Sequence, residues 1–232
     1  ASDTYRGYTF NGFDVNGSNV ETLTDQTLGE DLNVVASYTA NKEKVLYYTP
    51  SPTGKPYRIP AIATAPNGHI FAIADHRPCG NDIGYGEVDI KCRISTDNGE
   101  TWGEEFFIAD GLGEMAFLSE EDKNKTGDEL NAAKATLNNM YIGFGDASVV
   151  ADRESNKLLV MMVAGRTVCH NGRWDKTKIA DTTATAVNRV ARIYLTYNET
   201  TGEWDKSEIV EMTDHMYSIF LDGDKPTVTS MF

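Results

Sequence analysis

Two arginines and two aspartates of this 232-residue chain have types and spacing that could bind and cleave a ligand: Arg58, Arg77, Asp82 and Asp146. An arginine guanidinium offers two parallel donors that fit a planar carboxylate, and it stays charged when it is desolvated. A carboxylic acid held beside such arginines can protonate a leaving oxygen. Together these side chains predict a site that binds an acidic ligand and uses acid catalysis.

β-Strands must bring these residues together, because from Tyr57 onward apolar residues alternate with polar ones in short runs between turn residues. Four strands are expected near 57–64, 69–76, 87–95 and 104–109. Four more are expected near 146–152, 157–164, 190–197 and 206–212. The segment between the two sets is expected to hold a short helix around Leu130, Ala133, Ala135 and Leu137.

The two sets of strands form a repeat. "RIPAIATAPNGHIFAIAD" matches "DASVVADRESNKLLVMMVAG", which places Arg58 and Asp146 at corresponding positions. "KCRISTDNGETW" matches "ARIYLTYNETTGEW", so each set is expected to have a polar turn that ends in Trp between strands three and four. Repeated four-stranded antiparallel units predict an all-β fold of the β-propeller class, whose inner strands face the central axis.

The repeat accounts for about two blades, and "KPTVTSMF" resembles the first strand of a third. An open ring leaves unpaired strand edges, so the chain is expected to be a fragment or one half of a two-chain assembly. Residues 1–45 match neither blade and are expected to be a linker or lead-in segment, followed by a strand at "EKVLYYTP". Residues 46–232 are expected to be the N-terminal part of the propeller.

The turn "STDNGETW" at 95–102 joins strands three and four, so it should lie at the opposite end of the blade from Arg58. In this turn Asp97 can accept backbone hydrogen bonds, Gly99 can take a positive φ and Trp102 can bury its ring. The turn is therefore expected to be scaffolding. The loop "DHRPCGNDIGYGE" should instead place Arg77, Asp82 and Tyr85 at the same end as Arg58.

The formal net charge of −14 argues against nucleic acid as a partner, because binding to phosphates needs a basic patch. The same charge repels anionic ligands at long range, so local arginines must overcome that field. Three cysteines are too few for a disulfide framework or a zinc site, and we expect neither a metal nor another cofactor. No apolar run approaches the ~18 residues of a membrane span.

These residues resemble the sialidase (neuraminidase) family, and in particular the secreted bacterial exo-sialidases of the Bacteroides type. The resemblance rests on four segments: "YRIP" at 57–60, "DHRPCGNDIG" at 75–84, "VDIKCRISTDNGETW" at 88–102 and "GFGDASVVADRES" at 143–155. It implies a six-bladed propeller that is incomplete in this chain. The combination of Arg-Ile-Pro with the Ser-x-Asp-x-Gly-x-Thr-Trp turn is specific, although the turn alone also occurs in other carbohydrate-binding propellers.

The resemblance also implies roles for the four candidate residues. Arg58 would be the first of three arginines that clamp the sialic acid carboxylate, and Arg77 and Asp146 would contact substituents around the O4 hydroxyl. Asp82, on a mobile loop, would protonate the glycosidic oxygen and later activate water. The family uses a Tyr nucleophile with a Glu partner. These two residues and the other two arginines are expected beyond Phe232, so this chain alone is expected to be inactive.

Each candidate also has a purely structural interpretation. Arg58 could make a salt bridge within an inner strand, and Asp146 could cap a turn. Asp82 could be an ordinary turn residue in a loop rich in Gly and Asn. Arg77 could pair with Asp75 or Asp82 and only order the loop.

The function implied by the resemblance is a retaining exo-α-sialidase that hydrolyses terminal sialic acids. Its partners would be sialylated glycans, glycoproteins or glycolipids, and its location would be secreted or periplasmic. The remaining half of the propeller could be a separate chain. A non-catalytic glycan-binding propeller and a trans-sialidase are the alternatives, and Trp174 is a candidate for stacking on a sugar.

Overall fold

The computed structural model describes ten segments of the chain: residues 4–5, 8–22, 33–40, 44–49, 56–166, 169–170, 173–174, 189–219, 221–222 and 225–226. The chain divides into two compact units, Ala1–Val45 and Leu46–Phe232. Each unit is described by itself.

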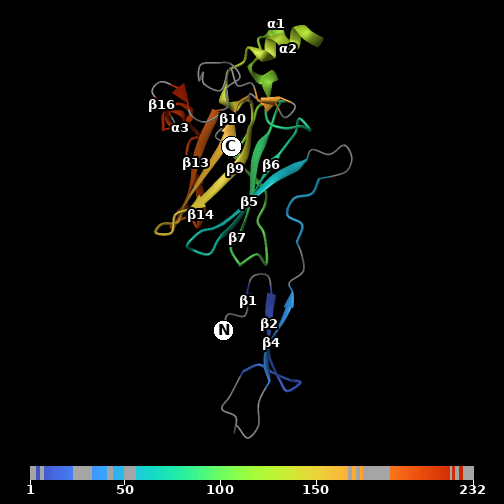
Figure 1. Cartoon of the computed structure of the whole chain (residues 1–232), viewed down its shortest axis with the longest axis vertical. Coiled ribbons are helices and arrows are strands. Elements are labelled where there is room, and N and C mark those ends of the chain that lie inside the picture. Colours follow the sequence, from blue (N-terminus) through green and yellow to red (C-terminus); the bar gives the residue numbers. More distant parts are fainter. Residues whose placement is uncertain are drawn as a thin grey trace. The chain divides into compact units, whose positions relative to one another are not determined.

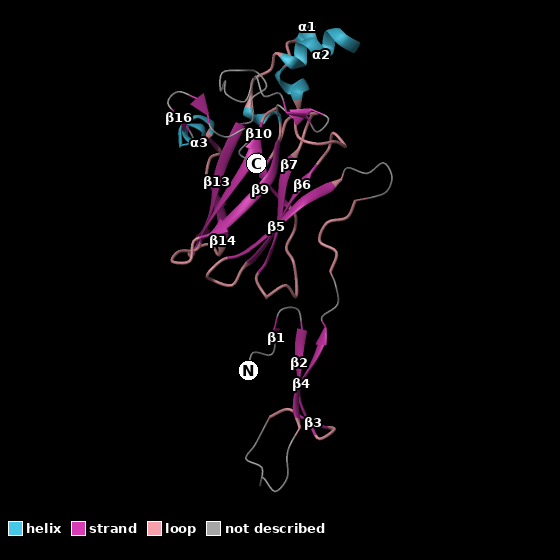
Figure 2. Ribbon diagram, viewed as in Figure 1, coloured by secondary structure: helices cyan, strands magenta, loops and turns pink. Residues whose placement is uncertain are grey.

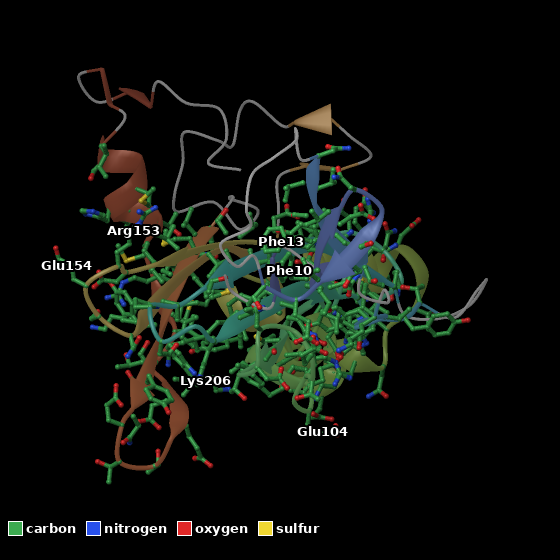
Figure 3. The ribbon with its side chains drawn as sticks, turned by 90° about the horizontal axis from the view of Figure 1, so that it is seen from below. Phe10, Phe13, Glu104, Arg153, Glu154 and Lys206 are labelled. Carbon is green, nitrogen blue, oxygen red and sulfur yellow. The ribbon has the colours of Figure 1, made fainter. Side chains whose placement is uncertain are left out.

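The first unit is a small antiparallel sheet. Its strands are β1 (Thr4–Tyr5), β2 (Tyr8–Val15), β3 (Ser18–Val20) and β4 (Val34–Ala40), with β2 paired to the other three. On β2 the rings of Phe10 and Phe13 lie 5.0 Å apart (Figure 3). Strands β2 and β3 are joined at Asn16–Gly17, both at positive φ, which is a common hairpin turn. These residues were expected to be a linker or lead-in segment, and this turn signal in "VNGS" was overlooked.

The first predicted blade is present as a four-stranded antiparallel sheet in the second unit (Figures 1 and 2). Its strands follow one another in the order β5 (Tyr57–Thr64), β6 (Ile70–His76), β7 (Asp89–Ser95) and β8 (Phe106–Ala109). The segment "EKVLYYTP", expected to be a further strand, has no strand in residues 44–49. There the Tyr47 hydroxyl instead donates a hydrogen bond of 2.6 Å to the Ala72 carbonyl on β6.

The second blade consists of β9 (Phe144–Ala151), β10 (Lys157–Ala164), β13 (Arg189–Asn198) and β14 (Glu203–Lys206). A short strand β15 (Val210–Glu211) also pairs with β13. The fourth strand was predicted at 206–212, which is too late. Gly202, at φ 73°, closes a tight turn by donating its N–H to the Asn198 carbonyl, so the strand resumes at once. As a result Trp204 lies within β14 and not at the end of a turn.

The two sheets pack face to face through the apolar side of each strand. On β6 and β7 this side carries Phe71, Ile73, Ile90 and Cys92, all fully buried. The facing residues on β10 and β13 are Leu158, Val160, Met162, Ala191, Ile193 and Leu195. Period-two alternation in the sequence therefore gives each sheet a buried face, and the all-β class with repeated four-stranded blades is confirmed.

A β-bulge interrupts the first strand of each blade at the same place. In β5 the pairing with β6 shifts between Arg58 and Ala61, and Ile59 has φ 52°. In β9 the shift leaves Asp146 without a direct partner, at φ 53°. The structural counterpart of Asp146 is therefore Ile59. The sequence alignment, which paired Asp146 with Arg58, was wrong by one residue.

The connection between the blades carries the predicted helix. Helix α2 (Gly127–Ala135) includes three of the four expected residues, and Leu137 lies beyond its end. It follows α1 (Glu120–Lys123) and lies between the short helices η1 (Glu114–Phe117) and η2 (Met140–Ile142). Figure 1 shows α1 and α2 beyond the ends of the blade strands.

The remaining elements of the second unit are short. They are β11 (Cys169–His170), β12 (Arg173–Trp174), α3 (Thr213–Ile219), β16 (Leu221–Asp222) and β17 (Lys225–Pro226). Most of "KPTVTSMF", expected to start a third blade, lies outside the described residues. In the described part of the chain, none of the helices is both long and apolar enough to cross a membrane.

Candidate functional site

The candidate residues gather at one end of the two inner strands, which we call the mouth end. Arg58 is the second residue of β5, Asp75 lies near the end of β6, and Asp146 lies near the start of β9. The loop from Arg77 to Val88 joins β6 to β7 at this end. Antiparallel pairing brings these four segments together, with Arg58 directly opposite Asp75.

A buried arginine lies at the centre of the cluster. The Arg77 side chain is 1% exposed, and its Nη2 donates a hydrogen bond of 2.9 Å to Asp75 Oδ2. Its Nη1 lies 3.0 Å from Asp82 Oδ1, and its Nη2 lies 3.9 Å from Asp146 Oδ1. The Nη1 contact has the distance of an ion pair but not the direction of a hydrogen bond. Nε and Nη1 therefore have no hydrogen-bond acceptor among the described residues.

Asp75 is the buried partner of this arginine. Its side chain is fully buried, and both of its oxygens are used: Oδ2 by Arg77 and Oδ1 by the Asp146 backbone N–H at 3.0 Å. Burial raises the pKa of Asp75 from 3.8 to about 7, although the hydrogen bond and charge of Arg77 oppose the shift. Asp75 thus links the guanidinium of Arg77 to the backbone of β9.

The two bulges distort the inner strands where these residues lie. A β-branched residue at positive φ is an outlier, and Ile59 is also followed by Pro60, which restricts it further. Such strain persists only where the surrounding structure enforces it, and it is concentrated at functional sites. At Asp146 the enforcing contact is its N–H bond to Asp75.

Asp82 lies on the loop and reaches solvent. Its side chain is 53% exposed on one side while Oδ1 faces Arg77 on the other. The loop around it is held by hydrogen bonds from Arg77 N to the Pro56 carbonyl and from Ile83 N to Asp82 Oδ1. Ile83 is buried beneath it. Asp82 is therefore anchored at its backbone, with its carboxylate within reach of a ligand.

Arg58 is exposed, and its positive charge lowers the pKa of Asp146. Burial and the charge of Asp82 act more strongly in the other direction, so the pKa of Asp146 is raised overall. Two cations and three carboxylates thus share one end of the sheets. Because the pKa values of Asp75 and Asp146 are both raised, these two carboxylates retain a proton more readily than isolated carboxylates do.

The turn "STDNGETW" lies at the opposite end, as expected. Ser95 pairs with Ile70, whereas the mouth-end residue Asp89 pairs with His76 at the other end of the same strands. Asp97 accepts hydrogen bonds from the Thr101 side chain and backbone, which lower its pKa to about 2. Gly99 has φ 87°. The turn is satisfied internally and shows the features of scaffolding.

Residue types and spacing predicted four of the five charged residues of the cluster around Arg77, but not the role of Asp75 as the link between them. Its signal was available: Phe71, Ile73 and Asp75 have the same parity in β6, which puts Asp75 on the buried face. The ion pairs considered for Arg77 are both present, because it pairs with Asp75 and with Asp82.

Other side chains proposed near the mouth end have different surroundings. Tyr85 lines a cavity of about 300 Å³ with Glu114 and Lys134. The side chain of Trp174 lies outside the described residues. Among the side chains that the structure describes, His, Cys, Asp and Glu form no group that could hold a metal ion.

Comparisons with known proteins show which proteins this chain resembles. No family model matches the chain. A segment of 55 residues is 46% identical to a sialidase of Micromonospora viridifaciens, and it covers 24% of this chain and 8% of that protein.

Two solved structures are similar at lower identity. The Hadza microbial sialidase Hz136 is 18% identical with a TM-score of 0.44, over 82% of this chain and 35% of that one. A K499G mutant of NanB sialidase from Streptococcus pneumoniae is 13% identical with a TM-score of 0.45, over 84% and 43%. The chain therefore spans less than half the length of each of these three relatives. The resemblance to sialidases predicted from the motifs is confirmed by the Micromonospora viridifaciens match, and this chain is similar to the sialidases.

Proposed function

We propose that residues 46–232 form the N-terminal part of the catalytic propeller of a retaining exo-α-sialidase, with residues 1–45 as its lead-in unit. The observation that carries the proposal is the cluster of Arg58, Arg77, Asp82 and Asp146 at one end of the inner strands. A cationic and acidic cluster of this kind suits a sugar that bears a carboxylate. The expected substrates are terminal sialic acids on glycoproteins, glycolipids or other glycans.

The roles follow from exposure and chemistry. Arg58 is exposed and free to approach a ligand carboxylate, as the first arginine of a clamp. Asp82 carries the proton for the glycosidic oxygen, and it is the most exposed of the three carboxylates that pair with Arg77. Asp146 contacts the substituents around the O4 hydroxyl of the sugar. The nucleophilic Tyr, its Glu partner and two further arginines come from sequence beyond Phe232.

Arg77 needs a change of contacts before it can touch a sugar, because its side chain is 1% exposed. Its Nη1 faces Asp82 without a hydrogen bond. When the Asp82 carboxylate turns toward a glycosidic oxygen, this donor becomes available for a ligand hydroxyl. Binding of the sugar and positioning of the Asp82 carboxyl group would then both depend on the Arg77 guanidinium.

The test is hydrolysis of sialosides by the full-length protein that carries this chain. Wild-type protein should release sialic acid from sialyllactose and from an aryl sialoside with a good leaving group. Asp82→Asn should lower kcat/KM for sialyllactose by about 100-fold or more, and less for the aryl sialoside, whose leaving group needs no proton. Asp97→Asn, at the opposite end of the blade, is the matched control and should keep wild-type kcat/KM.

Equal activity of Asp82→Asn and wild-type protein on both substrates would reject the acid role. Sialic acid binding without any release would favour a non-catalytic glycan-binding propeller. Transfer to an added acceptor sugar in place of hydrolysis would favour a trans-sialidase. A secreted or periplasmic location accords with substrates on extracellular glycans.

A further inference from the structure

Asp75 is the only charged residue at the mouth end, among those described, that contacts both Arg77 and the backbone of β9. Its Oδ2 lies 2.9 Å from Arg77 Nη2, and its Oδ1 accepts the Asp146 N–H at 3.0 Å. These two bonds join β6, the loop that follows it and the neighbouring blade. One carboxylate therefore determines the separation between Arg77 and the Asp146 bulge.

Burial excludes a direct role for this carboxylate. Asp75 is fully buried, so a ligand at the mouth cannot touch it unless the sheets separate. A buried carboxylate with fixed partners is costly to desolvate, and the raised pKa of Asp75 reflects this cost. A buried group that lowers the stability of the fold in this way is expected where it maintains a functional geometry.

The neighbouring backbone is fitted closely around this carboxylate. A Cβ atom added at Gly145 would lie 3.3 Å from Asp75 Oδ2 and 3.4 Å from Ile83 Cδ1. Glycine at this position lets β9 approach the carboxylate closely enough for the next residue, Asp146, to donate its N–H. The bulge, the glycine and the buried aspartate thus form one arrangement.

We propose that Asp75 is a positioning residue of the sialic acid site, which holds the Arg77 guanidinium and the left-handed Asp146 bulge at a fixed separation. The proposal rests on the proposed function in so far as Arg77 and Asp146 contact the sugar. Arg77 and Asp146 are the charged residues that interact with Asp75, and Asp75 itself acts on the ligand only through them.

Asp89 provides a matched control, because it is a second buried aspartate of the same sheet. It is 1% exposed, pairs with His76 Nδ1 at 2.9 Å and accepts the Gly111 N–H at 3.1 Å. It thus resembles Asp75 in burial, in having a basic side chain as its partner and in its bond to a backbone N–H. It contacts none of the four candidate site residues in the described structure.

The experiment compares Asp75→Asn and Asp89→Asn in the full-length protein. Both isosteric variants should fold and lose some thermal stability. Asp75→Asn should also lower kcat/KM for sialyllactose, by up to about 100-fold, because a displacement of site groups by about 1 Å is enough for such a loss. Asp89→Asn should stay close to wild-type kcat/KM. Equal losses in the two variants, or no loss in Asp75→Asn, would overturn the proposal.

A second readout needs no activity. In the protein labelled with ¹⁵N, a clamped Arg77 guanidinium should give separate signals for its two Nη groups, and these should merge in Asp75→Asn but not in Asp89→Asn. If wild-type protein hydrolyses no sialoside, the proposed function fails while merged signals still support the clamp. Unchanged Nη signals in Asp75→Asn would overturn the positioning role whatever the activity.

Discussion

At the scale of single residues, the candidate site is organised around a buried cation whose carboxylate partners differ in exposure. Asp75 is fully buried, Asp146 is 37% exposed and Asp82 is 53% exposed. The gradient suits different tasks: the most buried group holds the arrangement, and the most exposed one can reach a ligand. Residue types and spacing predicted Arg58, Arg77, Asp82 and Asp146. Alternation along β6 places Asp75 on the buried face, but its bond to the backbone N–H of Asp146 on the other blade cannot be predicted from residue types.

The pH dependence of stability tests the environment of Asp75. Burial raises its pKa in the folded protein from 3.8 to about 7, so between these values the folded state holds a proton that the unfolded state has lost. The contribution of Asp75 to the free energy of unfolding should therefore be largest below pH 4. It should fall as pH rises toward 7, with a slope on the order of 1 kcal/mol per pH unit from this group.

Asp75→Asn should lack this part of the slope while keeping the contributions of Asp89 and Asp146, whose pKa values are also raised. Urea unfolding of both proteins from pH 4.5 to pH 8 measures the difference. Parallel curves for the two proteins over that range would show that Asp75 keeps an ordinary pKa in the fold.

At the scale of elements, alternation of apolar residues predicted seven of the eight blade strands to within three residues at each end. The failures have local causes. One Gly202 turn moved the fourth strand of the second blade forward, and each inner strand carries a bulge, at Ile59 and at Asp146, that alternation did not predict. A bulge cannot be read from period-two alternation, because it breaks that period within a single residue.

The altered position of Trp204 leads to a prediction about packing between the blades. Its ring lies 4.7 Å from the Phe71 ring on β6, and its Nε1 donates to His69 Nδ1 at 3.0 Å. Trp204→Ala should lower the free energy of unfolding by about 2 kcal/mol, since it removes contacts between two sheets and opens a gap beside them. Trp204→Phe should lose about 1 kcal/mol, because it keeps the ring contact but not the hydrogen bond.

Thermal or urea unfolding measures both variants, and Trp102→Ala is the matched control. Trp102 follows the corresponding turn of the first blade, and no contact of its ring with the second blade is described. A loss in Trp102→Ala as large as in Trp204→Ala would contradict the view that Trp204 joins the blades. Lys206, labelled in Figure 3, adds a second link by donating to the Phe107 carbonyl on β8.

At the scale of the whole molecule, the chain carries 35 acidic and 21 basic residues, so its field repels an anionic ligand. Arg58 and Arg77 act against that field only at short range. Salt that screens this repulsion should therefore help the anionic substrate to reach the site. We expect kcat/KM for a sialoside to rise as ionic strength increases from about 0.01 M to about 0.15 M, because the Debye length then shortens from ~30 Å to ~8 Å. A steady fall over this range would mean that local arginines dominate the approach.

The most direct measurement of the central claim is a map of where sialic acid binds. In ¹⁵N-labelled protein titrated with N-acetylneuraminic acid, the backbone amide signals of Arg58, Asp82 and Asp146 should shift together, and those of Asp97 and Gly99 at the far end should stay in place. Shifts confined to the far end, or saturating sugar with no shift at those three amides, would contradict the account.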